Sequence, residues 1–393
     1  MKPNRGLFPI KNIPMRSYLD IWKKVFGPKP ARRIFIAATR QNVGKTTVSL
    51  GLIASMKKRF NEIGFIKPVG QRYLIEDGHK VDEDAVLMDR IFGFNQPLED
   101  MSPVAVERGY TEKFLDGSPI HDASSQIRDA FSRIIESKDI VIIEGTGHAG
   151  VGSVFDLSNA TVAKLLSSKV ILVSSGGIGN PIDEIMLNKS LFDNSGVELA
   201  GVIVNKVRMK KYDKINKYIR KGLARKGVPV LGVVPYVELL DMPTMWDIKD
   251  ELGMHILCGE DYLGMHIKKV LVGAMEVKDA LPYFEDDCVV ITPGDRLDLI
   301  NLAVNIHKGK GGYKKRIAGV ILSGGQAPSP RVYRALKNSN IPTLVTYHDT
   351  YRVTSQVHDL TVKIKSRDKA KVDIAMDLIE RYVDMDAVMR ILG

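Results

Sequence analysis

Nine consecutive residues, 39–47, have the composition of a loop that holds phosphate groups. They read Thr-Arg-Gln-Asn-Val-Gly-Lys-Thr-Thr, between an apolar, strand-like run and a helical pattern. In such loops backbone N–H groups and the helix N-terminus bind phosphates, the lysine reaches the terminal phosphates, and the threonine hydroxyl binds Mg²⁺. We therefore expect a nucleoside triphosphate with Mg²⁺ to be held by Thr39, Asn42, Val43, Gly44, Lys45, Thr46 and Thr47.

Two positions of this loop are unusual. Thr39 stands where such loops usually begin with glycine. Arg40 stands where one branch of phosphate-loop proteins has a second lysine that contacts phosphate, often across a dimer. A guanidinium there could stabilise charge on a phosphoryl group in transfer. The alternative, a solvated loop arginine, stays open.

Other charged residues follow strand-like segments. Glu144 could bind Mg²⁺ directly or through water. Asp82 and Asp84 open an expected helix, and either could complete the metal shell, although acids are favoured at helix N-termini anyway. Lys67 could clamp a phosphate or a carboxylate. From the residues alone, the candidate metal ligands are Thr46, Glu144 and either Asp82 or Asp84, and the candidate cations for phosphate binding and transfer are Arg40, Lys45 and Lys67.

The elements that position these residues alternate between strand and helix. Apolar strands are expected at 34–38, 63–69, 140–143, 170–173, 200–204 and 228–234, with helices at 46–60, 122–137, 158–167, 182–193 and 211–225. Continuous apolar strands alternating with helices predict an α/β fold with a doubly wound parallel sheet. Ligands of such sheets bind outside the carboxyl ends of the strands, where the residues above lie.

A second, smaller α/β unit is expected beyond Leu239. Its predicted strands are 268–272, 288–292, 317–322 and 343–346, and its predicted helices are 275–284, 296–306, 330–338 and 368–383. The expected organisation is a basic arm (1–33), a phosphate-loop domain (34–240), a second domain (245–365) and a C-terminal helix (366–393).

Composition restricts the compartment. Cys258 and Cys288 are the only cysteines among 393 residues, so no disulfide framework or cysteine zinc cage can form. Pro3, Pro9 and Pro14 interrupt the first apolar residues, and no apolar run approaches the roughly 20 residues that span a bilayer. We expect a cytoplasmic protein.

The net charge of +11 is concentrated at one end of the chain. Residues 1–33 carry nine Lys/Arg against Asp20, and the remainder adds only about +3, so nucleic acid is not an expected partner. Within this arm, the segment Tyr18 to Phe26 could form a short amphipathic helix on an anionic membrane or a partner complex. The arm could equally pack on its own domain.

Seven segments in order carry a resemblance: Ala38 to Thr46, Lys67-Pro68-Val69, Asp84-Ala85, Ser102-Pro103, Glu144-Gly145-Thr146-Gly147, Leu199 to Asn205 and Leu231 to Pro235. Over residues 34 to about 240 the chain resembles dethiobiotin synthetase. The resemblance implies that Lys45 and Thr46 serve phosphate and Mg²⁺, and that Asp84 and Glu144 serve the metal. It also implies that Lys67 stabilises the phosphoryl group and that Asn205 hydrogen-bonds the base.

The base is expected to be adenine. An amide such as that of Asn205 both donates and accepts, as adenine requires, and no aspartate follows up to Arg208 to complete a guanine-reading motif. The resemblance also implies a homodimer that pairs across the nucleotide site, where Arg40 could reach a partner's phosphate.

Departures from the family point to another substrate. Asn42 replaces an acidic loop residue, and His148 replaces a second glycine. The segment Gly147 to Gly152 is therefore expected to be a different substrate loop, and biotin synthesis is not expected.

The second unit also carries a resemblance, through Val270 to Phe284, Gly294-Asp295-Arg296, Leu322 to Gly325, Pro328 to Pro330 and Thr346 to Thr350. These segments look like the DRTGG domain, the middle part of long bacterial phosphotransacetylases, with Ser323 replacing threonine. Asp295 and Arg296 could contact a ligand or form an internal ion pair. Because the sequence stops at Gly393 without an acetyltransferase domain, a phosphotransacetylase is not expected.

Two functions follow as hypotheses. The first is an ATP- and Mg²⁺-binding ATPase, with slow hydrolysis, whose DRTGG-like domain senses a small molecule or a protein partner. The alternative is a synthetase-type enzyme that activates a carboxylate or carbamate by phosphoryl transfer.

Overall fold

The computed structural model describes residues 31–117 and 122–393. They divide into two compact units, one formed by the chain up to Pro235 together with Met376–Gly393, and the other by Tyr236–Ala375. The predicted helix from Tyr18 to Phe26 lies outside the described residues. No helix in the described part of the chain is both long and apolar enough to cross a membrane.

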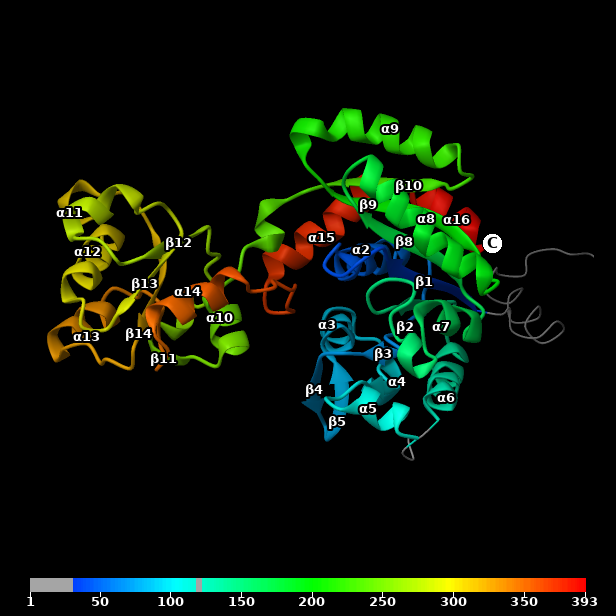
Figure 1. Ribbon diagram of the computed structural model, residues 1–393, viewed down its shortest axis with the longest axis horizontal. Coiled ribbons are helices and arrows are strands. Elements are labelled where there is room, and N and C mark those ends of the chain that lie inside the picture. The colour runs from blue at the N-terminus through cyan, green and yellow to red at the C-terminus, as the bar shows by residue number, and fades with distance from the viewer. Residues whose placement is uncertain (1–30, 118–121) are drawn as a thin grey trace, which may run out of the picture. The chain divides into compact units, whose positions relative to one another are not determined.

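A six-stranded parallel sheet forms the centre of the first unit (Figure 1). Its strands are β1 (Arg32–Ala38), β2 (Ile63–Ile66), β7 (Ile140–Glu144), β8 (Lys169–Ser175), β9 (Leu199–Val207) and β10 (Val230–Pro235), in the order β10-β9-β8-β1-β7-β2. Consecutive strands lie on both sides of β1, which makes its carboxyl end the switch point where ligands bind in such sheets. The predicted α/β, doubly wound fold is confirmed.

Helices pack on the faces of this sheet. They are α2 (Lys45–Met56), α6 (Ala123–Ile135), α7 (Asn159–Leu165), α8 (Gly179–Asn194) and α9 (Tyr212–Ala224). One face of β1, β7, β8 and β9 forms a single apolar core with α6 to α9. In α6 the buried residues Ile127, Ala130, Phe131 and Ile134 recur at helical spacing, which explains why the sequence predicted this helix well. Helix α2 also contacts β1 and β7, but none of its residues belongs to this core.

A hairpin that the sequence analysis missed precedes the site. It consists of β4 (Tyr73–Glu76) and β5 (His79–Asp82), joined by Asp77 and Gly78, whose φ angles are 49° and 83°. Asp-Gly with positive φ at both positions is typical of a two-residue hairpin turn. The hairpin leads directly into α3 (Glu83–Phe92), followed by α4 (Leu98–Met101) and α5 (Tyr110–Leu115). Strand β3 (Val69–Gly70), before the hairpin, pairs in parallel with β6 (Val104–Ala105), which lies between α4 and α5.

The C-terminal segment, expected as one helix, forms two: α15 (Lys369–Tyr382) and α16 (Met385–Leu392). The helix breaks because Val383 forms an antiparallel bridge with Gly232 of β10, and the N–H of Asp384 donates to Leu231 O at 2.8 Å. The Asp384 carboxylate then caps α16 by accepting from the N–H of Ala387. The end of the chain therefore packs against the edge of the first unit's sheet.

The second unit is built on a five-stranded sheet. Its strands are β11 (His255–Cys258), β12 (Lys269–Val272), β13 (Cys288–Pro293), β14 (Ile317–Ser323) and β15 (Thr343–Val345), in the order β11-β15-β14-β13-β12, with only β11 antiparallel. Its helices are α10 (Met245–Leu252), α11 (Val277–Ala280), α12 (Leu297–His307), α13 (Pro330–Lys337) and α14 (Thr350–His358). One core cluster contains α12 and α13, and another contains α10 and α14.

One predicted helix of this unit is shorter than expected. The segment 275–284 forms α11 and then a 3₁₀ turn over Leu281–Tyr283. Pro282 lacks a backbone N–H and so cannot continue the α-helical hydrogen bonding.

Candidate functional site

The phosphate loop follows β1 at the switch point of the first unit's sheet. Thr39 extends the strand, because its N–H donates to Val173 O at 2.9 Å. Asn42 (φ 60°) and Gly44 (φ 95°) have left-handed backbone conformations that turn the chain into α2. Helix α2 begins with no side-chain cap and no acid in its first turn. Its first N–H groups are thus suited to an anion.

Asn205 lies against this loop from β9. A Cβ atom on Gly44 would come within 2.3 Å of Asn205 Nδ2, so the close approach requires glycine. Asn205 Nδ2 donates to Val43 O at 2.9 Å, and its Oδ1 accepts from Lys206 N–H at 2.8 Å. In this geometry the buried amide holds the loop. Its predicted contact with a base stays a prediction.

Four predicted residues from separate elements meet behind the loop. Thr46 Oγ1 lies 3.3 Å from Asp84 Oδ1 and 3.2 Å from Glu144 Oε1. Lys67 Nζ lies 2.6 Å from Asp84 Oδ2 and 3.1 Å from Glu144 Oε1. The side chains of Lys67 and Glu144 are 5% and 0% exposed. We call Thr46, Lys67, Asp84 and Glu144 the carboxylate cluster.

Asp82 positions the cluster without joining its hydrogen bonds to Thr46. Its carboxylate accepts from Asp84 N–H at 3.0 Å and so caps the N-terminus of α3. This hydrogen bond fixes the backbone of Asp84, whose side chain belongs to the carboxylate cluster. The N–H of Asp82 donates to Ser102 Oγ at 3.0 Å. Of the two acids that the sequence left open, Asp84 is the one that reaches Thr46.

The charge of Lys67 is strongly stabilised. Burial opposes its charged form, but the carboxylates of Asp84, Glu144 and Asp82 together outweigh burial and raise the pKa of Lys67 well above its ordinary value. The ammonium therefore stays protonated at neutral pH and supplies a fixed positive charge beside the phosphate loop.

The cluster also fits Mg²⁺. Glu144 Oε2 is buried and has no hydrogen-bond partner among residues 31–117 and 122–393, so it is available to a cation. Hydroxyl and carboxylate oxygens are the ligands that Mg²⁺ prefers, and water and substrate phosphates usually complete its shell. The described residues contain no group of three or more His, Cys, Asp or Glu that could hold a metal by itself.

Arg40 lies at the rim and away from the carboxylate cluster. Its Nη2 donates to Ser175 Oγ at 3.1 Å, its Nη1 lies 3.9 Å from Glu184 Oε1, and its side chain is 57% exposed. The guanidinium is held beside the loop but faces solvent. Its predicted catalytic role therefore stays a prediction.

The predicted substrate loop, Gly147 to Gly152, is tied to the phosphate loop by a residue that the sequence analysis missed. Asn188 Oδ1 accepts from Ala149 N–H at 2.8 Å, and its Nδ2 donates to Thr39 O at 3.4 Å. His148 is exposed. The available signal was spacing, because Asn188 recurs with Ile185 and Phe192 on the buried face of α8.

Arg296 of the second unit forms an ion pair, but with a different acid from the one expected. Its Nη2 lies 3.0 Å from Asp298 Oδ2 and donates to Met275 O at 2.9 Å, while Asp295 is exposed. The guanidinium thus ties the loop after β12 to the start of α12.

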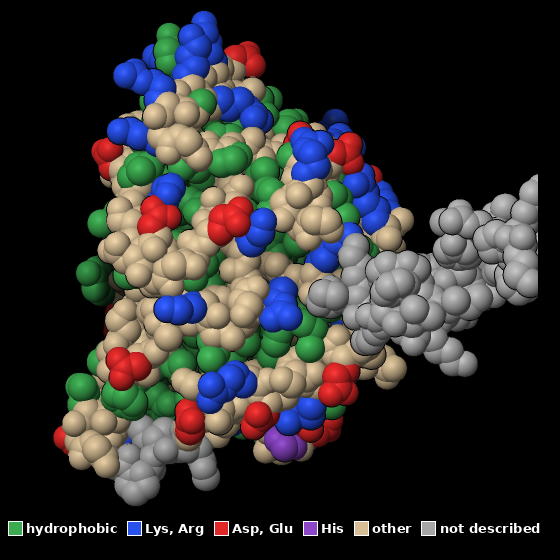
Figure 2. All heavy atoms as spheres, turned by 90° about the vertical axis from the view of Figure 1, so that its right-hand side faces the viewer, with side chains coloured by type: hydrophobic (Ala, Val, Ile, Leu, Met, Phe, Trp, Pro, Cys, Tyr) green, Lys and Arg blue, Asp and Glu red, His purple; other side chains and the backbone are tan. Residues whose placement is uncertain are grey.

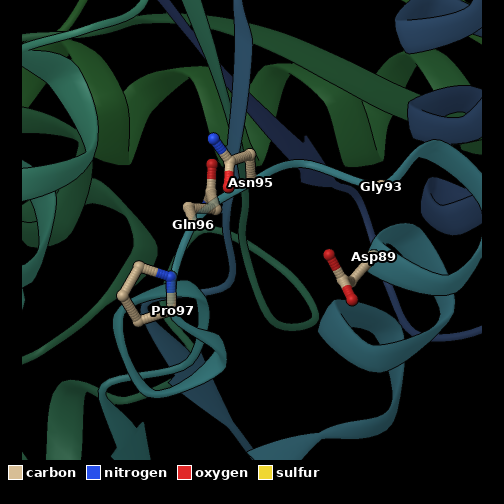
Figure 3. A pocket seen from close by; sticks show the side chains of 5 residues that line it. All are labelled: Asp89, Gly93, Asn95, Gln96 and Pro97. Carbon is tan, nitrogen blue, oxygen red and sulfur yellow. The ribbon is translucent and has the colours of Figure 1, made fainter.

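An open hollow of about 540 Å³ lies elsewhere in the first unit, lined by Asp89, Gly93, Asn95, Gln96 and Pro97 (Figure 3). Gln96 Nε2 donates to Phe65 O at 2.7 Å, which covers the free edge of β2. Asp84 lies in the first turn of α3, whereas the residues that line the hollow lie in the second half of this helix or follow it. The hollow is not part of the phosphate-loop site.

A family model described as an AAA domain matches residues 32–244, more than half of the chain. The chain belongs to this AAA domain family. A second model, described as a DRTGG domain, matches residues 247–360. The AAA domain carries the phosphate loop and the carboxylate cluster, and the phosphate-loop fold is one that binds nucleotides with Mg²⁺ in general.

Curated relatives match both domains. A phosphate acetyltransferase of Nitratidesulfovibrio vulgaris is 25% identical over 365 residues, which cover 90% of this chain and 51% of the relative. A phosphate acetyltransferase of Pseudomonas putida is 27% identical over 369 residues, covering 89% of this chain and 50% of the relative. The chain spans about half the length of these relatives. The predicted resemblance to the N-terminal and middle parts of long phosphotransacetylases is confirmed.

These relatives correct one expectation. We expected the chain not to be a phosphotransacetylase, yet relatives that match about nine-tenths of it carry that name. The expectation rested on where the sequence ends, which does not exclude the activity.

A similar solved structure contains the CBS and DRTGG domains of the regulatory region of Clostridium perfringens pyrophosphatase, complexed with the activator diadenosine tetraphosphate. It is 22% identical, covers 30% of this chain and 47% of its own, and has a TM-score of 0.24.

Proposed function

We propose that this protein binds Mg-ATP in its AAA domain and that its DRTGG domain senses a small ligand or a protein partner. The observation that carries the proposal is the carboxylate cluster, which gathers a hydroxyl, two carboxylates and a buried ammonium behind the phosphate loop. This combination fits a metal-bound triphosphate, because the oxygens suit Mg²⁺ and the ammonium suits phosphate.

Each residue has a defined task in this proposal. The loop N–H groups and Lys45 bind the phosphates, and Thr46, Asp84 and Glu144 hold the metal. Bound Mg²⁺ would neutralise phosphate charge. Lys67 keeps its ammonium protonated and lies where it can stabilise charge on the terminal phosphoryl group.

The sequence supports adenine over guanine, because the guanine-reading motif after Asn205 is incomplete. The names of the relatives also suggest what the domains regulate. We propose that nucleotide and ligand binding modulate the transfer of an acetyl group to phosphate, either by the whole protein or by a partner.

A second candidate is a synthetase that activates a carboxylate or carbamate. It is favoured by Asn188, which holds the loop from Gly147 to Gly152 directly against the phosphate loop. A substrate on that loop would lie next to the terminal phosphate. The test is release of ADP in the presence of carboxylic acids and amines, and it fails if no compound accelerates release.

Calorimetric titration with ATP and GTP, with and without Mg²⁺, tests the main proposal. We expect Mg²⁺-dependent binding of ATP that Lys45→Ala weakens about tenfold to a hundredfold, because a charge-assisted contact is lost. Lys164→Ala, an exposed lysine on α7, is the matched control and should bind normally. Equal affinity of the Lys45→Ala variant, or no binding by the wild type, would refute the nucleotide site. Fast ATP turnover coupled to a small carboxylate would instead favour the synthetase.

A further inference from the structure

The segment 206–226 is the most basic part of the described chain outside the arm. It contains ten Lys/Arg and a single acid, Asp213. Nine of the basic residues are exposed, and we call them the basic ridge: Arg208, Lys210, Lys211, Lys214, Lys217, Arg220, Lys221, Arg225 and Lys226. Figure 2 shows Lys and Arg side chains gathered at the top of the molecule, where α9 lies.

The cations of the ridge form no ion pair with a carboxylate of residues 31–117 and 122–393. None of the nine lies within ion-pair distance of a carboxylate there, and the ion pairs in that part of the chain involve other basic residues. Arg220 is held by neutral groups, donating to Asn216 Oδ1 at 2.8 Å and to Val230 O at 2.9 Å. Lys217 Nζ lies 5.8 Å from the centre of the Tyr218 ring, and the ridge side chains are exposed to an external anion.

The spacing of the ridge works against the helix that carries it. Lys214, Lys217 and Lys221 are separated by three and four residues, so they form one row along α9, and Lys210 before the helix and Arg225 at its C-cap continue the same spacing. Like charges at this spacing repel. Lys214, near the N-terminal end, also opposes the helix dipole, whereas Lys221 in the last turn favours it. The dipole therefore favours only the C-terminal end of the row.

The opposite face of α9 explains how the row is presented. Ile215, Ile219 and Leu223 are buried in the core of the AAA domain. Half of the helix is thus covered by its own domain, and only the cationic side protrudes. A helix seated in this way can lie along a flat anionic surface.

Two exposed apolar residues accompany the cations. Tyr218 lies in the row, four residues after Lys214 and three before Lys221, and is 46% exposed; Met209 precedes the helix and is 62% exposed. Tyrosine and long lysine stems are the side chains that suit a membrane–water interface. Contact with phosphate groups alone would not bury the apolar surface of either side chain.

We infer that the basic ridge docks this protein on an anionic lipid surface. Clustered Lys/Arg residues near a membrane of acidic lipids each add to its attraction, and Tyr218 and Met209 would enter the headgroup layer. The inference concerns a surface distinct from the carboxylate cluster, so it does not depend on the proposed nucleotide function.

Flotation of the full chain with phosphatidylcholine vesicles, with and without phosphatidylserine, tests the inference. We expect binding only to the acidic vesicles, weakening as salt is added. The triple variant Lys214→Gln, Lys217→Gln, Lys221→Gln should bind them about 100-fold more weakly, which corresponds to about 3 kcal/mol. Glutamine keeps the helix propensity.

The control variant Lys113→Gln, Lys164→Gln, Lys169→Gln removes three exposed lysines elsewhere on the AAA domain and should bind like the wild type. The wild type and both triple variants keep residues 1–33, so a difference in their vesicle binding reports the ridge and not the arm. The midpoint of urea unfolding should be the same in the wild type and both triple variants, which shows that the domain is folded. Equal vesicle binding by both triple variants, or tighter binding to duplex DNA than to acidic vesicles at the same salt, would overturn the inference.

Discussion

Lys67 shows how a single residue can serve both stability and chemistry. Its ammonium lies between Asp84 and Glu144, and all three side chains are largely withdrawn from water. Two carboxylates so close together need a cation, and Lys67 supplies it from the end of β2. Bound Mg²⁺ would supply the same kind of compensation. The residue that we propose to stabilise a phosphoryl group is therefore also the counter-ion of the metal ligands.

Replacing Lys67 by methionine should lower the free energy of unfolding by about 3–5 kcal/mol, because buried carboxylates lose their partner. Added Mg²⁺ should restore part of the loss, since a ligand that binds the native state stabilises it. Urea unfolding with and without Mg²⁺ measures both effects. Lys80→Met, at an exposed lysine, is the control and should change little.

The pH dependence of this effect has a defined sign. The pKa of Lys67 is raised in the folded state, so its stabilisation is fully present below the ordinary lysine value of 10.5 and is lost only as pH rises through the folded value. The difference between wild type and Lys67→Met should therefore be the same at about pH 7 and about pH 9. A difference that shrinks over this range would contradict the buried ion pairs.

At the scale of elements, the phosphate loop depends on neighbours that are distant in sequence. β9 contributes Asn205, which holds Val43, and α8 contributes Asn188, which holds Thr39. Gly44 completes the arrangement, because any side chain there would collide with Asn205. The loop is thus fixed at both of its ends before a ligand arrives, which reduces the entropy cost of binding.

The variant Asn205→Ala should bind ATP and inorganic triphosphate about tenfold more weakly, and to a similar degree for both ligands. The reason is that the loop that holds the phosphates loses its hydrogen bond to Asn205. Competition titrations with the two ligands provide the measurement. Asn61→Ala, at an exposed asparagine, is the control. Weaker binding of ATP alone would show that Asn205 reads the base.

At the scale of the whole molecule, the exposed guanidinium of Arg40 suggests a second copy of the chain. Its side chain faces solvent at the rim of the phosphate loop, where a partner's nucleotide could reach it. We propose that Mg-ATP brings two AAA domains together across their nucleotide sites. In such a dimer Arg40 would act on the partner's phosphate.

Small-angle scattering should therefore give about twice the monomer mass when Mg-ATP is present and a lower mass without nucleotide. Arg40→Ala should bind ATP but form the dimer less readily. Arg59→Ala, at an arginine paired with Asp386 on another surface, is the control. A monomer with ATP bound would remove the proposed role of Arg40 in the partner's site.

The sequence by itself determined the features that depend on residues close together in the chain. The apolar run before Thr39, the glycine turn and the helix after Lys45 predicted the phosphate loop, and periodic apolar positions predicted most strands and helices within a few residues. The sequence also contained the row of cations on α9, but the net charge summed over all residues after 33 concealed it. The hairpin from Tyr73 to Asp82 could have been found from Asp77-Gly78.

Only the tertiary structure decided which distant side chains meet. It chose Asp84 over Asp82 as the neighbour of Thr46, and it turned the amide of Asn205 toward Val43. It also brought the guanidinium of Arg296 to Met275 O, 21 residues earlier in the chain. These contacts join residues from different strands and helices, or depend on how a loop folds back. No local pattern specifies them, because their distances are set by how the sheet aligns its strands and how each helix crosses it.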